Sequence, residues 1–296
     1  MHDVANYYNR NTKSFLAFGR GSRRSATIHR ALWAPGVTTL DQAMDYIHQR
    51  IIAALGERRG AAAAEPGPDT TASRLPHFAD LGCGVGASAA RIGTALCGRT
   101  TGVTLSTIQT EIATRRIADA AATSRQRVLV GDFTDPRAWE HVGRWGSLNG
   151  AWMIEAFNHG RDPQAVLTAL ATACKPGAVV AICDDLPDDA RRPQNRREQF
   201  WEREFLRGWH VHTWRSAPAI AATASQVGFE HLRTEDFSDW VAVDRPRDFA
   251  VRMVAGPAAA FGLRSGFWDN IRGGNALQQL GKRRIVRYQM VVLRRR

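Results

Sequence analysis

The chain has 296 residues, of which 44% are hydrophobic, and this is enough apolar material for one large domain or a domain with a lid. The apolar runs are short and interrupted, which disfavours a membrane span, and residues 1–15 lack the apolar core of a secretion signal. We therefore expect a cytoplasmic protein. Its four cysteines are scattered and expected to be reduced and mostly buried: Cys83, Cys97, Cys174 and Cys183.

The formal net charge of +12 is concentrated at the two ends of the chain. Residues 1–30 carry a net charge of +5 and residues 270–296 one of +8, so the 239 residues between them sum to −1. A protein that tracks phosphates carries a basic stripe across its working face. The distribution therefore disfavours a nucleic-acid partner and draws attention to the N-terminal segment.

Residues 40–55 place apolar side chains on one helical face and predict a helix, with Thr38 or Thr39 as its cap. Residues 56–74 mix glycine, proline and small residues without a periodic pattern, which is typical of a linker. We therefore expect residues 1–74 to form an N-terminal cap with a helix and a linker, before a larger domain begins.

Over residues 75–296, short apolar strands alternate with helices, which predicts an α/β fold with a doubly wound, mostly parallel sheet. The strands are expected at 77–81, 101–105, 127–132, 150–155, 178–184, 228–237 and 284–295, with helices at 87–96, 107–122 and 163–174. Residues 187–227 are charged, rich in tryptophan and helical in character. They interrupt the alternation, as a lid inserted over an active site would.

The stretch FADLGCGVG ends a strand at Asp80 and continues with Gly82, Gly84 and Gly86 before a helix. Glycines are needed where the backbone turns sharply and a ligand passes close to it, and a helix start offers free N–H groups. A tight turn without a ligand is the simpler alternative. The G-x-G-x-G spacing, with the acid two residues before it, resembles the first motif of class I S-adenosylmethionine-dependent methyltransferases.

The resemblance covers residues 77–185 and implies a Rossmann-like, seven-stranded sheet that binds S-adenosylmethionine. It assigns cofactor contacts to the first motif, where the glycines pack under the methionine and ribose: Asp80, Gly82, Cys83, Gly84 and Gly86. The later stretch GDF resembles the motif whose acid, here Asp132, accepts a hydrogen bond from the adenine amino group beside an apolar neighbour, here Phe133.

The stretch GVTLSTIQ places Thr104 where many methyltransferases have an acid that grips the ribose. It resembles the sub-group of sterol, tocopherol, cyclopropane-fatty-acid and prenyl-diphosphate methyltransferases. In that sub-group the threonine, the following backbone and a glutamine hold the adenosine, which implies the same for Thr104, Leu105 and Gln109. A hydroxyl and an amide can bind ribose without a second anion near the methionine carboxylate. Ser106 is suited to cap the helix that starts at 107.

The stretch WMIEAFNHGRD follows the fourth strand and resembles the E-x-x-x-H segment of the same sub-group, with Glu155 and His159 as the matching residues. A glutamate in an apolar context costs folding free energy unless it is paired with another group or has a role in the chemistry. In C-methylation a carboxylate stabilises the carbocation and then removes a proton. A salt bridge to Arg161 or to a neighbouring arginine is the alternative. His159 is suited to position Glu155, bind substrate or cap the loop, and the sequence does not distinguish these roles.

The N-terminal stretch NYYNRNTKSF resembles the tyrosine-containing cap of the sub-group, which closes over cofactor and substrate. We therefore expect Tyr8 to take part in catalysis. Arginine forks suit a diphosphate, and aromatic faces attract cations. The expected substrate-binding residues are Tyr7, Asn11, Arg20, His29, Arg30, Trp33 and Trp152. For any single arginine, the alternative is that it belongs to a basic, solvated arm. For any single tryptophan, the alternative is ordinary packing.

These features predict a C-methyltransferase that acts on an alkene carbon of a small isoprenoid, with a prenyl diphosphate as the substrate. The alternative is an O- or N-methyltransferase of a small molecule in secondary metabolism, with Glu155 or His159 as base. A nucleic-acid methyltransferase fits the neutral core less well. We expect no metal held by the protein alone. The sequence leaves open whether Mg²⁺ accompanies a diphosphate, which carbon is methylated and whether the chain forms homo-oligomers.

Overall fold

The computed structural model describes residues 5, 8, 9, 12, 27–57, 75–119, 125–142, 146–243 and 266–296. Most of the linker expected over 56–74 lies outside the described residues. No helix in the described part of the chain is both long and apolar enough to cross a bilayer.

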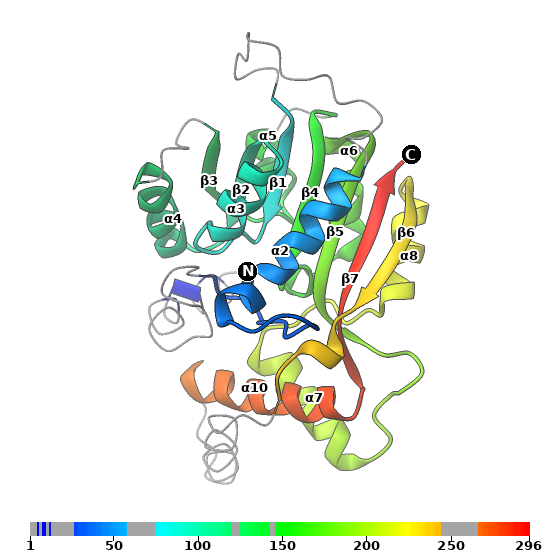
Figure 1. The fold of residues 1–296 in the computed structure, drawn as a ribbon. Coiled ribbons are helices and arrows are strands. Elements are labelled where there is room, and N and C mark those ends of the chain that lie inside the picture. Colours follow the sequence, from blue (N-terminus) through cyan, green and yellow to red (C-terminus); the bar gives the residue numbers. More distant parts are fainter. Residues whose placement is uncertain are drawn as a thin grey trace.

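The described strands form one seven-stranded sheet in the order β3-β2-β1-β4-β5-β7-β6, which confirms the Rossmann-like prediction (Figure 1). Their bounds are β1 His77–Leu81, β2 Arg99–Thr104, β3 Gln126–Val130, β4 Leu148–Ile154, β5 Cys174–Pro187, β6 Phe229–Asp236 and β7 Val286–Arg295. Strands β1 to β5 pair in parallel, whereas β7 runs antiparallel to both of its neighbours, β5 and β6. The parallel strands therefore end at a common edge.

The described helices are α2 Leu40–Gly56, α3 Ala87–Ala95, α4 Thr107–Asp119, α5 Pro136–Val142, α6 Pro163–Ala173, α7 Arg196–Gly208, α8 Ala217–Gln226 and α10 Gly266–Lys282. Two 3₁₀ turns, η2 Phe157–His159 and η3 Ser238–Trp240, follow β4 and β6. The predicted helix over 40–55 is confirmed. Its cap is Thr39, whose side chain accepts a hydrogen bond from the backbone N–H of Gln42, and the Gln42 side chain accepts one from the backbone N–H of Thr39.

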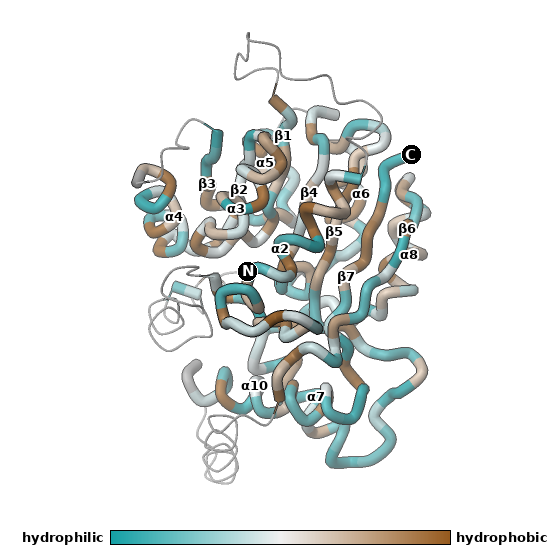
Figure 2. Tube along the Cα trace, viewed as in Figure 1, coloured by the Kyte–Doolittle hydropathy of each residue, from teal (hydrophilic) through white to brown (hydrophobic). Residues whose placement is uncertain are grey.

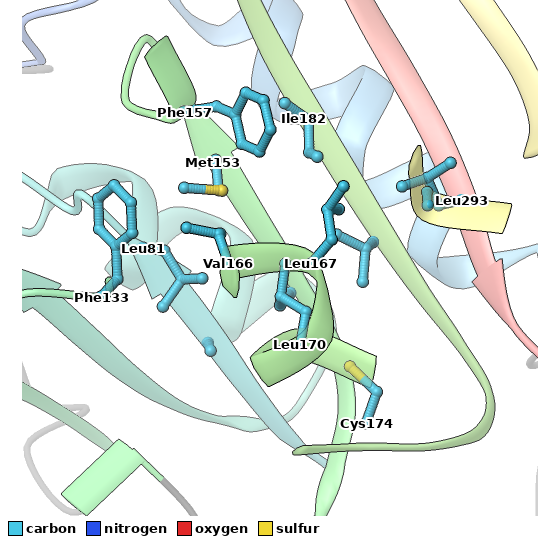
Figure 3. Close-up of a cluster of buried hydrophobic side chains, with 14 of the residues drawn as sticks. Leu81, Phe133, Met153, Phe157, Val166, Leu167, Leu170, Cys174, Ile182 and Leu293 are labelled. Atoms are coloured by element: carbon cyan, nitrogen blue, oxygen red, sulfur yellow. The ribbon is translucent and has the colours of Figure 1, made fainter. Parts of the chain in front are cut away.

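Two apolar clusters pack on opposite faces of the sheet, because successive strand residues point to opposite sides. One cluster joins Met153 and Ile182 to α5, α6 and α8 (Figure 3). The other joins Trp152 and Cys183 to α2 and α3. The central strands β4 and β5 are therefore buried on both faces, as parallel strands under helices usually are. The edge strand β6 is more hydrophilic, as Figure 2 shows, and this protects an open sheet edge from pairing with other chains.

The segment expected to form a lid divides into two parts. Helix α8 packs against α6 and β6 as a layer of the main domain. Helix α7 pairs instead with α10 through an apolar cluster that includes Trp201, Phe205 and Leu280. This helix pair lies beyond the edge where the parallel strands end (Figure 1). Helix α2, from the expected N-terminal cap, packs on the sheet beside α3.

Candidate active site

A pocket of about 870 Å³, including its open mouth, lies at the edge where β1, β2 and β4 end. Its wall is built by the residues after these strands, by the start of α3 and by the N-terminal segment. The lining comprises Tyr8, Thr27, Ile28, His29, Asp80, Gly82, Cys83, Gly84, Val85, Ala87, Ser88, Thr104, Leu105, Gln109, Phe133, Ile154, Glu155, Ala156 and His159. The carboxyl edge of a parallel sheet is where α/β proteins bind ligands.

The glycine loop after β1 shapes this wall. Gly82 has a φ of +83°, and a Cβ there would lie 2.3 Å from Cβ of Ala156, so only glycine fits between the two turns. Gly84 has a φ of +53° and has nothing within 4 Å of such a Cβ, which leaves its backbone open to the pocket. Gly86 is the N-cap of α3 and packs against Ala113, outside the pocket lining.

Asp80 supplies an unsatisfied polar atom at the bottom of the pocket. Its side chain is buried, and its Oδ2 has no hydrogen-bond partner among the described residues. Burial raises the pKa of this carboxyl to about 7, opposed by the neighbouring Trp152 indole. Buried polar groups normally find partners, and the indole N–H of the neighbouring Trp152 is also unpaired, so Asp80 can bond to this indole as well as to a ligand. The buried Cys83 thiol beside it has its pKa raised by burial, which keeps it unreactive.

Thr104 and Gln109 face the pocket as a bonded pair. The Thr104 hydroxyl donates to Oε1 of Gln109 at 2.7 Å. Ser106 between them caps α4, because its Oγ accepts from the backbone N–H of Gln109 at 3.1 Å. The Ser106 hydroxyl also donates to Oδ1 of Asn9 at 2.6 Å. This serine therefore caps a helix, as expected, and also connects the N-terminal segment to the pocket wall.

Phe133 lines the pocket next to Leu105, but Asp132 does not. Oδ1 of Asp132 accepts from the backbone N–H of Thr134 at 2.8 Å and from its hydroxyl at 2.6 Å. This is the local turn that aspartate commonly forms with the residue two positions on. The structure therefore brings the apolar half of the GDF motif to the pocket and uses the acid to shape the loop.

Glu155 is held firmly at the pocket wall. Its φ is +52°, a strained conformation for a residue other than glycine, and its backbone N–H donates to the carbonyl of Cys183 at 2.8 Å. Oε1 accepts from the backbone N–H of Arg30 at 2.8 Å and from the Tyr288 hydroxyl at 3.0 Å. Both donors are neutral, and the structure records no salt bridge to Arg161. The Arg30 guanidinium is close enough to feel this acid: burial opposes it, but the charges of Asp185 and Glu155 raise the pKa of Arg30. Strain held in this way is characteristic of functional positions.

His159 connects the N-terminal segment to the loop after β4. Its Nδ1 donates to the carbonyl of His210 at 3.2 Å, so its Nε2 accepts from the Tyr8 hydroxyl at 2.8 Å. Burial lowers the pKa of His159 to about 4, which keeps the ring neutral. Of the roles left open by the sequence, the contacts favour one that places Tyr8 over the pocket.

The expected substrate-binding residues are only partly brought together. His29 lines the pocket, whereas Arg30 forms a buried ion pair with Asp185 at 2.8 Å and its guanidinium lies 5.4 Å from the ring centre of Tyr288. Trp33 is an exposed side chain, and Trp152 packs against Phe78 in the core. Neither tryptophan lines the pocket. Tyr7, Asn11 and Arg20 lie outside the described residues.

Sequence reasoning missed the polar layer beneath the pocket. Tyr288 on β7 and the buried Asp184 on β5 belong to it. Asp184 accepts from the backbone and the side-chain amide of Asn158, both at 3.0 Å, and burial raises its pKa to about 8. Paired buried polar groups are not visible in a one-dimensional pattern, although the DD of β5 inside an apolar strand was a usable signal. No cluster of three or more metal-ligating side chains occurs in the described part of the chain.

Residues 44–234 match the profile of a methyltransferase domain family. The chain belongs to the class I S-adenosylmethionine-dependent methyltransferases. Among curated proteins it is 24% identical over 77% of its length to "Probable tocopherol O-methyltransferase, chloroplastic" from Oryza sativa subsp. japonica. It is 26% identical over 54% of its length to 24-methylenesterol C-methyltransferase 3 from Arabidopsis thaliana. These matches span 63% and 43% of the lengths of the two relatives.

Among solved structures, the geranyl diphosphate C-methyltransferase from Streptomyces coelicolor A3(2) superposes with a TM-score of 0.64. The match covers 100% of this chain and 98% of that one at 15% sequence identity, which establishes a shared fold. That structure holds Mg²⁺, geranyl diphosphate and S-adenosyl-L-homocysteine.

Proposed function

We propose that the protein transfers a methyl group from S-adenosylmethionine to an alkene carbon of an isoprenoid, with a prenyl diphosphate as the preferred substrate. One observation carries the proposal: Glu155 stands at the pocket wall on a strained backbone, with its Oε1 held by the backbone N–H of Arg30 and the hydroxyl of Tyr288. A carboxylate in this state is suited to stabilise a nearby cation and to accept its proton.

The pocket fits the cofactor. The loop at Gly82 and Gly84 has no Cβ atoms to obstruct a ligand, and Asp80 lines the same pocket. Thr104 and Gln109 offer neutral groups for the ribose, and Phe133 an apolar surface for the adenine. Bound S-adenosylmethionine would supply an electrophilic methyl group. The remaining chemistry belongs to the side chains around the acceptor.

In this scheme the alkene carbon would bond to the methyl carbon as the methyl–sulfur bond breaks and S-adenosylhomocysteine leaves, and Glu155 would stabilise the positive charge on the neighbouring carbon. Both hydrogen bonds to this side chain reach Oε1. We therefore assign proton removal to Oε2. Tyr8, held by His159, would cover the site and exclude water that would otherwise quench the cation.

The net charge of +5 over residues 1–30 suits a diphosphate substrate, and Mg²⁺ bound with the diphosphate would supply further positive charge. The related chain from S. coelicolor binds both Mg²⁺ and geranyl diphosphate, which supports this choice of substrate.

The second candidate is an O-methyltransferase, and the name of the rice relative favours it. Glu155 would then remove a hydroxyl proton rather than a proton on carbon. The two reactions differ in what happens to hydrogen on the alkene carbon. C-methylation with loss of a proton removes deuterium from the labelled vinyl position, whereas O-methylation retains it.

The test is a mass-spectrometric screen of prenyl diphosphates with methyl-labelled cofactor, followed by Glu155→Gln on the substrate that reacts. We expect turnover to fall by about a thousandfold or more while S-adenosylhomocysteine still binds with nearly unchanged affinity. The exposed Glu140→Gln serves as the matched control and should retain full turnover. Retained turnover in Glu155→Gln would remove this residue from its role, and retained deuterium would favour O-methylation.

A further inference from the structure

Two buried histidines meet behind the pocket wall. His29, in the N-terminal segment, lines the pocket. His48, on α2, contacts His29 from the side away from the pocket lining. Their Nε2 atoms lie 3.0 Å apart, and the rings stand nearly perpendicular at 88°. His29 is 6% exposed and His48 is 3% exposed, so the two rings contact each other directly and are shielded from bulk water.

The remaining ring nitrogens both face groups that only accept hydrogen bonds. Nδ1 of His29 lies 3.0 Å from the carbonyl oxygen of Arg30, and Nδ1 of His48 lies 3.2 Å from Oδ1 of Asp45. Each Nδ1 must therefore carry a hydrogen. The bond between the two Nε2 atoms needs a third hydrogen, but two neutral imidazoles hold only two. The hydrogen-bond pattern thus requires one extra proton, and the pair carries a charge of +1.

The neighbouring charges decide where this proton resides. Two hydrogen bonds from Arg91, both 2.9 Å, hold the Asp45 carboxylate from α3. Although partial burial opposes it, hydrogen bonds from His48 and Arg91 lower the pKa of Asp45, so this acid is ionised. Burial and the nearby His48 lower the pKa of His29 to about 3. Because the Asp45 carboxylate faces the His48 ring, the geometry places the extra proton there, between His29 and Asp45.

We propose that this His29–His48 pair is the positive group that binds the carboxylate of the amino-acid end of S-adenosylmethionine. The inference rests on the proposed cofactor but not on the proposed acceptor. None of the described lining residues is a lysine or an arginine, while Asp80 and Glu155 are acids. A ligand carboxylate needs a cation or strong donors to enter such a wall.

Ser88 completes the proposed subsite. Its hydroxyl lies 3.0 Å from Nε2 of His48 and lines the pocket together with His29. The hydrogen on Nε2 of His48 would then be shared between Nε2 of His29 and Oγ of Ser88 in a three-centre bond, and the Ser88 hydroxyl can donate its own hydrogen to a ligand carboxylate. The buried charge thereby reaches the ligand through one hydroxyl, without a charged side chain inside the cofactor pocket.

The first test compares two ligands by isothermal titration calorimetry. S-adenosylhomocysteine has the amino-acid carboxylate, and 5′-methylthioadenosine retains the adenosine and sulfur without it. In His48→Gln we expect about tenfold weaker binding of the first ligand and unchanged binding of the second. His77→Gln, which alters another buried histidine bonded to Thr101, should change neither. Equal weakening of both ligands, or of neither, would overturn the proposal.

The second test uses pH, and it does not depend on a variant that disturbs the core. Binding of S-adenosylhomocysteine should weaken as rising pH removes the shared proton. Asp45→Asn removes the stabilising carboxylate, so this loss should move to lower pH, with affinity weaker at pH 8 and restored at pH 6. A merely structural role for Asp45 would not be rescued by acid, and absence of rescue contradicts the proposal.

Nitrogen NMR of the labelled wild-type protein reads the same proton directly. A doubly protonated ring at His48 at pH 7 supports the pair, and two neutral rings exclude it. This measurement needs neither ligand nor acceptor. Binding of S-adenosylhomocysteine with no methylated alkene would refute the proposed acceptor alone, whereas failure of the wild-type protein to bind it would refute the cofactor assignment.

Discussion

The Tyr288 hydroxyl donates to Oε1 of Glu155 at 3.0 Å, although the two residues are 133 positions apart in the sequence. Tyr288 lies on β7, and Glu155 follows β4 on the other side of β5. Burial raises the pKa of the Tyr288 phenol well above its ordinary value, with Cys183 and Glu155 as further causes. The phenol therefore remains a neutral donor throughout the physiological range and fixes one carboxylate oxygen without neutralising the acid.

Replacing Tyr288 by Phe should lower kcat by about tenfold, because one hydrogen bond that positions the base, worth about 1 kcal/mol, is lost. Affinity for S-adenosylhomocysteine should stay unchanged, since Tyr288 does not line the pocket. Steady-state kinetics and calorimetry check the two expectations. The control is Tyr46→Phe on α2, which packs against Trp240. An unaltered kcat in Tyr288→Phe would mean that this phenol does not position Glu155.

Gly82→Ala should destabilise the fold by about 3 kcal/mol, because the added methyl group would overlap Ala156 and the φ of +83° disfavours any side chain. Gly36 provides a matched control with a φ of +82° and nothing within 4 Å of its Cβ position. Gly36→Ala should therefore cost only the backbone strain, about 1 kcal/mol. Urea unfolding of both variants measures the difference, and equal losses would refute the steric argument.

Asp80→Asn should change how stability depends on pH. The pKa of Asp80 is raised from 3.8 to about 7 in the folded state, so the folded protein binds a proton that the unfolded chain has released. The free energy of unfolding should therefore fall as pH rises from about 4 to about 7, by about 4 kcal/mol from this group. Relative to wild type, Asp80→Asn should be more stable at pH 8 than at pH 4.

Urea unfolding of the wild type and the variant at both pH values isolates this contribution, because the other carboxyl groups are common to both proteins. The exposed Glu111→Gln should show no such difference. If wild type and Asp80→Asn change in parallel with pH, the buried carboxyl is ionised in the fold.

Arg30→Met should lower the free energy of unfolding by about 3 kcal/mol, because it removes the cation that faces the buried Asp185. The backbone N–H of Arg30 still reaches Glu155, so binding of S-adenosylhomocysteine should persist. Thermal unfolding and calorimetry test this, with the exposed Arg161→Met as control. An undiminished stability combined with a raised KM for a diphosphate would instead place Arg30 in substrate binding.

The parallel part of the fold could be predicted because β1, β4 and β5 are apolar on both faces and glycines mark the turn after β1. The polar residues at strand ends, Thr104 and Glu155, then had to meet at one edge of the sheet. Contacts that depend on strand order were not predictable in this way. Tyr288 reaches Glu155 only because β7 enters beside β5, and no local pattern encodes that neighbour.

A local turn orients Asp132. Its Oδ1 accepts from the N–H and the hydroxyl of Thr134 two residues on, and both bonds leave Oδ2 for the adenine contact, which stays a prediction. The sequence did not predict the His29–His48 contact. It joins the N-terminal segment to the inner side of α2, and each histidine alone resembles an ordinary core residue.

The position of β7 also has a consequence for biosynthesis. Val286–Arg295 is synthesised after β5 and β6, yet it inserts between them rather than adding at an edge. Until it emerges, β5 presents an unpaired edge to other nascent chains, and Glu155 lacks the tyrosine hydroxyl that holds its Oε1. A partly synthesised chain that already contains the glycine loop after β1 would thus lack the finished surroundings of Glu155, and chaperone protection would matter most until Val286–Arg295 has been made.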